Sequence, residues 1–298
     1  MRVRIERVAL RLVVIAVVPY IALKLLWLTG ASIGVRNETA LAELHSTRMI
    51  VGNNVTILLE LMAVALALAL SSSWGRRVPA WFMIGVGAGA TGLLAPILLG
   101  LPVGSVLQLA VQGDVRTGGM DHLSPWVFAI VYGGFGLMAI GIVVLASRYA
   151  AARWGHVLRR PPGAPPVLVR VAGGLGLLPF GTAMLWWGVF DPGSTGPQAM
   201  DAVVQRATLV VTGLLAVAGF LAPLLPGISR RAPRLTWLAI WVGCTTAALQ
   251  ALTHVLLADG GHPSRAMLLI GVLTVSGSSV YGLLLLRRHP AHDRLRPA

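Results

Sequence analysis

The stretch that decides the fold reads Pro19-Tyr20-Ile21-Ala22-Leu23-Lys24-Leu25-Leu26-Trp27. Nearly the same signature returns at residues 179–187, with Pro179-Phe180, then Met184, then Trp187 at matching positions. A second signature, Arg76-Arg77-Val78-Pro79, recurs in the same order as Arg230-Arg231-Ala232-Pro233. Two matched signatures in the same order indicate a tandem duplication, and a repeat of this kind fixes the architecture of a chain. We therefore predict two similar halves.

The composition places these halves in a membrane. The mean hydropathy is +0.79, and only 11% of the residues are charged, against about 25% in soluble domains. A water-soluble domain of 298 residues could not bury so much apolar surface, so the chain must use lipid as its solvent. The net charge of +14 does not indicate a nucleic-acid partner, because the arginines lie in short segments between long apolar runs.

Apolar stretches of about 20 residues, long enough to cross a bilayer as helices, occur eight times. They lie near residues 8–30, 51–72, 80–112, 126–147, 167–190, 204–226, 236–257 and 266–286. The third stretch is too long for one straight span, and we expect Pro96, Gly100 and Pro102 to break it. That leaves residues 101–112 as a short interfacial or re-entrant piece. The predicted fold class is all-α, a polytopic membrane protein with eight transmembrane helices.

Positive charge sets the predicted orientation. With the N-terminus inside, seventeen of the 24 basic residues lie in the inner segments and four lie in the outer ones. Both termini are therefore predicted to be cytoplasmic, in a multi-pass protein of the cell membrane. A basic start followed by an apolar run is also typical of a cleaved signal peptide. We nevertheless expect the first span to be retained, because its repeat partner at 167–190 is internal.

Each predicted repeat holds four spans, an even number, so both copies face the same way and the repeats are parallel. The first four-helix membrane repeat covers 1–147 and the second covers 167–298. Between them, residues 148–166 form a cytoplasmic linker rich in arginine and proline. Its first part, 148–160, is either a short surface helix attracted to anionic headgroups or a solvated loop.

Polar and ionisable side chains inside a bilayer are costly, and they usually mark function or structural pairing. Three polar stripes each share one helix face: Tyr20, Lys24 and Trp27 in the first span, Asn53, Thr56 and Glu60 in the second, and Thr246, Gln250 and His254 in the seventh. A rise of about 1.5 Å per residue places all three in the outer half of the membrane. The candidate substrate-binding residues are Tyr20, Lys24, Asn53, Glu60, Gln250 and His254.

A purely structural interpretation of these residues stays open. Lys24 could extend to the outer headgroups beside Trp27 as an interfacial anchor, or it could form an ion pair with Glu60 on the adjacent helix. In the repeat alignment, Lys24 corresponds to Met184 and Glu60 to Leu214, so the polar residues do not repeat although the scaffold does. One asymmetric site between the halves would give this pattern, and so would drift after duplication.

Known catalytic and cofactor motifs are missing from the sequence, including those for ATP binding, zinc peptidases, serine hydrolysis and prenyl diphosphates. No two histidines have a metal-ligand spacing, and we predict no metal, no cofactor and no catalytic residue. Pro19-Tyr20 through Trp27, followed by Gly30, resembles the first span of uncharacterised polytopic integral membrane proteins of high-GC Gram-positive bacteria. This resemblance implies a multi-span membrane location and carries no known active site.

Three functions agree with these patterns. The first is a non-enzymatic membrane protein that binds or transports a small or amphipathic molecule through an outer-half polar site between the two repeats. The second is a membrane-embedded enzyme acting on a lipid or terpenoid, with Glu60 as general acid. The third is a structural or accessory subunit of a membrane complex, docking through its arginine-rich inner face. We favour the first.

Overall fold

The chain is an integral membrane protein built from helices. The computed structural model describes residues 2–115, 118–258 and 262–287, and no strand forms within these ranges. Eight of the helices are long and apolar enough to cross a membrane, which confirms the predicted all-α class with eight spans. They are α1 (Arg2–Leu28), α3 (Thr47–Ser71), α4 (Ala80–Gln112), α5 (Pro125–Leu158), α6 (Val167–Phe190), α7 (Val203–Leu221), α9 (Pro233–Leu256) and α10 (Arg265–Arg287). Short helices in the connections are α2 (Glu38–Leu44), η1 (Trp74–Arg76), η2 (Gly118–Asp121), η3 (Ala222–Leu224) and α8 (Pro226–Arg231).

Helix α4 is continuous over 33 residues, so the predicted break at Pro96, Gly100 and Pro102 is wrong. Each proline removes only one hydrogen bond from the ladder, and membrane helices tolerate this when neighbouring groups compensate. Gly100 serves close packing instead. A Cβ on Gly100 would lie 2.9 Å from the Cα of Thr208, so α4 and α7 approach at backbone distance there.

Helix α5 runs beyond the predicted end of its span. The apolar run predicted an end at residue 147, but helical structure continues to Leu158, through the first part of the predicted linker. Trp154 has φ −124° and ψ 18°, values outside the helical region, so two helical pieces meet at this residue. Residues 148–153 therefore extend the span as helix, rather than forming a separate surface helix or loop.

The chain packs as two compact units. The first comprises Met1–Gly87 and Asp114–Arg153, and the second comprises Ala88–Gly113 and Trp154–Ala298. The division falls inside α4, after Gly87, and at the kink of α5. These units are defined by packing alone, and the tandem repeats at 1–147 and 167–298 stay a prediction.

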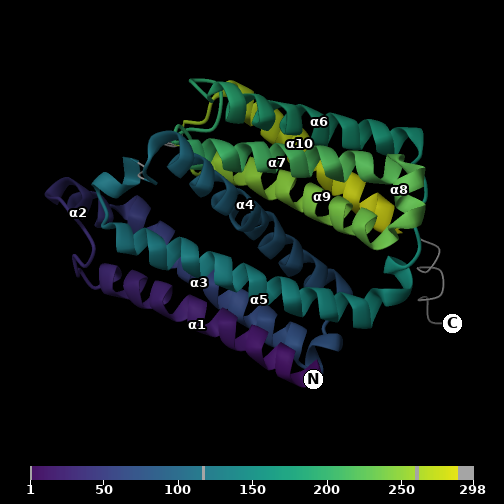
Figure 1. Ribbon diagram of the computed structural model, residues 1–298, viewed down its shortest axis with the longest axis horizontal. Coiled ribbons are helices and arrows are strands. Elements are labelled where there is room, and N and C mark those ends of the chain that lie inside the picture. Colours follow the sequence, from purple (N-terminus) through teal and green to yellow (C-terminus); the bar gives the residue numbers. More distant parts are fainter. Residues whose placement is uncertain (1, 116–117, 259–261, 288–298) are drawn as a thin grey trace. The chain divides into compact units, whose positions relative to one another are not determined.

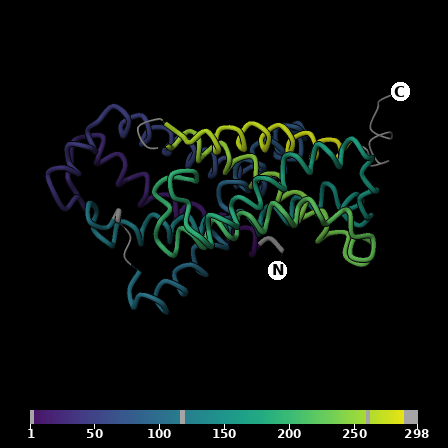
Figure 2. Tube along the Cα trace, turned by 90° about the horizontal axis from the view of Figure 1, so that it is seen from above, coloured from purple at the N-terminus to yellow at the C-terminus, as the bar shows by residue number. Residues whose placement is uncertain are grey.

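The second unit is centred on a ring of four helices, in which α6 and α9 each pack against both α7 and α10. Figures 1 and 2 show these helices running alongside one another. Glycines allow the closest crossings: a Cβ on Gly176 would lie 2.7 Å from the Cα of Gly277, and one on Gly219 would lie 2.8 Å from the Cα of Gly243. Small residues at such contacts let membrane helices gain packing energy that lipid cannot supply. The buried Tyr281 adds a hydrogen bond from its hydroxyl to the Phe220 carbonyl, 2.9 Å long.

The α6–α10 crossing gives a direct stability test. Gly176→Ala should lower the free energy of unfolding by about 1–3 kcal/mol, because the added methyl group meets backbone that cannot rotate away. Gly174→Ala, two residues earlier in the same helix, is the matched control, since its Cβ would meet only the Phe220 ring at 3.6 Å. Thermal unfolding in detergent measures both variants. Equal melting temperatures for the two would contradict the packing described here.

The first unit holds α1, α3 and the main part of α5. Helix α1 packs against α3, and two glycines of α5 bring it close to α1: a Cβ on Gly134 would lie 3.0 Å from the Ala16 carbonyl oxygen, and one on Gly141 would lie 2.8 Å from that of Ala9. At one end, Trp27 belongs to a buried cluster and is only 4% exposed. Its indole N–H donates to the Ile33 carbonyl at 2.8 Å, so the interpretation of Trp27 as an interfacial anchor is wrong.

Candidate functional site

The lysine of the first span is enclosed within the first unit. Lys24 is 9% exposed, and its Nζ donates to the Asn53 side-chain oxygen at 2.6 Å. The same Nζ lies 5.1 Å from the Tyr20 ring centroid and 5.4 Å from that of Trp27, within the range of cation–π attraction. Lys24 is therefore held by its own helix and by α3, and it does not extend to the headgroups.

Local sequence explains this enclosure. Tyr20, Lys24 and Trp27 stand four and three residues apart, so the two rings flank the ammonium on one face of α1. On α3, the Ser46 side chain caps the N-terminus by accepting from the Met49 amide at 3.3 Å, which fixes where the helix begins. Asn53 then lies two turns into α3, level with Lys24.

Glu60 lies deeper and apart from Lys24. It follows Asn53 by seven residues, or about 10 Å along α3, and it is 5% exposed. The ion pair between Lys24 and Glu60 considered from the sequence does not form. Among the residues that the structure describes, Glu60 makes no hydrogen bond and no ion pair. An acidic side chain thus lies buried in a span with no hydrogen bond or ion pair to another described residue.

Hydroxyl groups and aromatic rings surround this region of the first unit. Tyr20 lies within electrostatic range of Thr56, Glu60 and Tyr132. The Tyr20 ring meets the Phe135 ring edge to face, with their centroids 5.3 Å apart. The site therefore combines α1, α3 and α5, and its members from the prediction are Tyr20, Lys24, Asn53 and Glu60.

Sequence reasoning missed the contribution of α5. Tyr132 and Phe135 are three residues apart and their rings are 6.3 Å apart, and Phe128 stacks on Tyr132 at 6.2 Å. Spacings of three and four residues place these three side chains on one helix face, a signal that was available from the sequence. Tyr132 is 40% exposed, so this aromatic face extends from the buried Tyr20 toward the surface of the helix bundle.

Gln250 and His254, the remaining candidate residues, belong to the second unit. The Gln250 side chain donates to the Gly92 carbonyl at 3.1 Å, which joins α9 to α4 and gives Gln250 a structural role. The Nε2 of His254 and the hydroxyl of Thr246 are buried, and neither finds a hydrogen-bond partner within the described ranges. The predicted polar face of α9 is therefore partly used for packing and partly unpaired.

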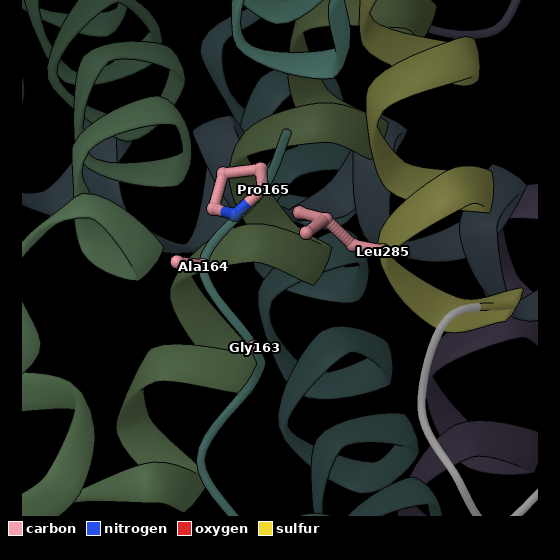
Figure 3. A pocket seen from close by; sticks show the side chains of 4 residues that line it. All are labelled: Gly163, Ala164, Pro165 and Leu285. Carbon is pink, nitrogen blue, oxygen red and sulfur yellow. The ribbon is translucent and has the colours of Figure 1, made fainter. Parts of the chain in front are cut away.

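Figure 3 shows a hollow in the second unit, and none of the polar residues of this face lines it. Its lining consists of Gly163, Ala164, Pro165 and Leu285, at the start of α6 and the end of α10. None of these side chains is ionisable, and the arginine distribution predicts this end to be cytoplasmic. The hollow therefore offers no ionisable side chain to a charged ligand.

Metal binding finds no support in the described ranges, where no group of three or more histidine, cysteine, aspartate or glutamate side chains could hold an ion. The chemistry that the first unit offers is a buried ammonium that is already solvated by an amide and two rings, and a buried carboxyl group that is not. Comparisons with protein-family models, with curated protein sequences and with solved structures gave no match to this chain.

Proposed function

We propose that this integral membrane protein binds or transports a small or amphipathic molecule, and that Glu60 is the group that recognises it. The observation that supports the proposal is the burial of Glu60 without a hydrogen bond or ion pair to another described residue. A carboxyl group inside a span costs free energy, and this cost is usually offset by a partner or by a function. In this interpretation a bound molecule supplies the missing partner.

The arrangement around Lys24 supports the same interpretation. Its ammonium is satisfied by Asn53 and by the Tyr20 and Trp27 rings, and it lies about 10 Å along the helices from Glu60. Lys24 therefore does not compete with a ligand for the Glu60 carboxyl group. Its role is to fix α1 against α3, while the aromatic face of α5 contacts the apolar part of an amphipathic ligand.

The enzyme interpretation has less support. Among the described residues, Glu60 is the one buried carboxylate, so the core offers no second carboxyl group for paired acid–base catalysis. We therefore place binding or transport ahead of catalysis.

Extraction of bound molecules tests the proposed function for a ligand of any chemical class. The full chain is purified from membranes into lipid nanodiscs, and co-purifying small molecules are quantified by mass spectrometry. Glu60→Gln should lose at least one molecule that the unaltered chain retains, because the amide cannot supply the carboxylate charge. Glu43→Gln, an exposed glutamate of α2, is the control and should retain it. Identical spectra for all three proteins would refute the proposed role of Glu60.

A further inference from the structure

A second hollow lies in the first unit, between the beginning of α1 and the end of α3. It is lined by Glu6, Arg7, Leu10, Ser71 and Ser72. The arginine distribution predicts this end of both helices to be cytoplasmic. The hollow is separate from the candidate site, because Lys24 lies near the other end of α1 and Glu60 lies about 16 Å along α3 from Ser71.

Of the charged side chains that line this hollow, Arg7 is the cation that can bind an anion. Glu6 is held by Arg148, whose Nε donates to the Glu6 carboxylate at 2.8 Å. Arg7 is exposed, and it makes no hydrogen bond or ion pair with another described residue. The carboxylate is therefore neutralised by its own partner, and the Arg7 guanidinium is the group that can engage an anion.

Backbone carbonyls at the end of a helix repel anions, but two of the last four carbonyls of α3 accept hydrogen bonds. The Ser71 hydroxyl donates to the Leu68 carbonyl at 3.1 Å, and the Ser72 amide donates to the Ala69 carbonyl at 3.4 Å. In the turn that follows, the Gly75 carbonyl accepts from the Tyr149 hydroxyl at 2.9 Å. The Ser72 hydroxyl makes no bond within the described residues, so it is a second donor beside Arg7.

Neighbouring side chains place the hollow at the depth of lipid headgroups. Trp74, Trp81 and Phe82 follow closely in sequence, and all three are exposed, Trp81 by 74%. Exposed tryptophans are typical of the membrane–water interface. Arg76 and Arg77 are exposed in the same turn and add positive charge. An anion bound at this depth therefore belongs to a lipid headgroup. Leu10 offers an apolar contact to the glycerol end of that lipid.

We propose that this hollow binds the phosphate of an anionic phospholipid headgroup. The Arg7 guanidinium presents its paired N–H groups to two phosphate oxygens, and the Ser72 hydroxyl donates to a third. Arg76 and Arg77 favour anionic over zwitterionic lipids through longer-range attraction. The assignment does not depend on the function proposed for Glu60.

Native mass spectrometry of the full chain in non-ionic detergent tests the site, with phosphatidylglycerol and phosphatidylcholine of identical acyl chains as probes. The unaltered protein should bind phosphatidylglycerol more tightly, and Arg7→Gln should reduce that preference by roughly 5- to 10-fold. Ser72→Ala should reduce it by a smaller factor. Arg7 and Ser72 make no side-chain bond within the described structure, so neither change should impair folding.

Arg11→Gln is the matched control, because Arg11 is exposed one turn further along α1 and does not line the hollow. It should leave the lipid preference within about twofold of the unaltered protein. Equal losses of lipid preference for Arg7→Gln and Arg11→Gln would show that the preference comes from diffuse electrostatic attraction and not from a site. That result would overturn the proposal. Displacement of phosphatidylglycerol by millimolar inorganic phosphate would also overturn it, because the ligand would then be a free anion.

Discussion

Replacing Asn53 by leucine should lower the free energy of unfolding by about 3 kcal/mol. The Lys24 ammonium would lose its one amide acceptor, at 2.6 Å, while it stays enclosed by apolar surroundings. Hydrogen bonds to charged groups contribute about 1.5–3 kcal/mol, and a buried charge left without its partner costs more than the bond itself. Cation–π contacts with Tyr20 and Trp27 remain, and they offset only part of this loss.

The double variant Lys24→Met with Asn53→Leu should recover most of that stability. Removing both partners removes the buried charge together with its need for an acceptor, and such replacements are often neutral. Methionine is also the residue at the aligned position of the second half, Met184, which is fully buried. Reversible titration with sodium dodecyl sulfate, followed by circular dichroism, gives the free energies for this double-mutant cycle.

Asn54→Leu provides the control for the cycle. Asn54 is exposed, and its side chain bonds only to the Ile50 carbonyl of its own helix, so its replacement should change stability by less than about 0.5 kcal/mol. A similar loss for Asn54→Leu and Asn53→Leu would mean that helix propensity, and not the Lys24 contact, dominates. If the double variant does not recover the lost stability, Lys24 contributes more through packing than through its charge.

The sequence predicted the spans because hydropathy responds directly to the lipid solvent. It failed where a local rule was applied without its packing context. Proline and glycine in α4 predicted a break, yet Gly100 meets α7 at backbone distance and the helix continues through both prolines. Neighbouring helices decide such cases, and a single span does not reveal its neighbours.

The sequence predicted which helix faces form the candidate site, but not the relative positions of the residues along the helix axes. Helical spacing identified the faces of α1 and α3 that meet, since Lys24 does contact Asn53. Spacing says nothing about how far two antiparallel helices slide along each other, so Glu60 was considered as a partner in place of Asn53. That offset depends on the connection between the helices, where the Asn37 side chain caps α2 and Ser46 caps α3. Neither cap could be predicted from the pattern of apolar residues.

The tryptophans of the first signature make matching contacts, while the duplication itself stays a prediction. Trp27 and Trp187 are both buried, and each donates its indole N–H to the connection that follows its helix, at Ile33 and at Thr195. The same role at matched positions agrees with a common origin. The position between them that differs is Lys24 against Met184, so among the described residues the buried ammonium occurs in the first predicted half alone.

Glu60 should select ligands by the sign of their charge. Tetraphenylphosphonium and tetraphenylborate have nearly the same size and shape but opposite charges, which makes them matched probes. We expect the cation to bind the purified chain, because Glu60 is buried without a hydrogen bond or ion pair to another described residue, and because the Tyr20 and Tyr132 rings accept a cation on their faces. An ion pair at about 4 Å contributes about 4 kcal/mol at an effective dielectric constant of 20, before desolvation is subtracted.

Glu60→Gln should therefore weaken binding of tetraphenylphosphonium by about 10- to 100-fold, as measured by equilibrium dialysis, and leave tetraphenylborate unaffected. Glu43→Gln removes the same charge from an exposed position on α2, so it measures the effect of net charge alone. Tighter binding of the borate by the unaltered chain would assign recognition to Lys24 instead, since only a cation that is free to leave Asn53 could attract it. That outcome would move the ligand about 10 Å along the helices, from Glu60 to the end of the site that Trp27 closes.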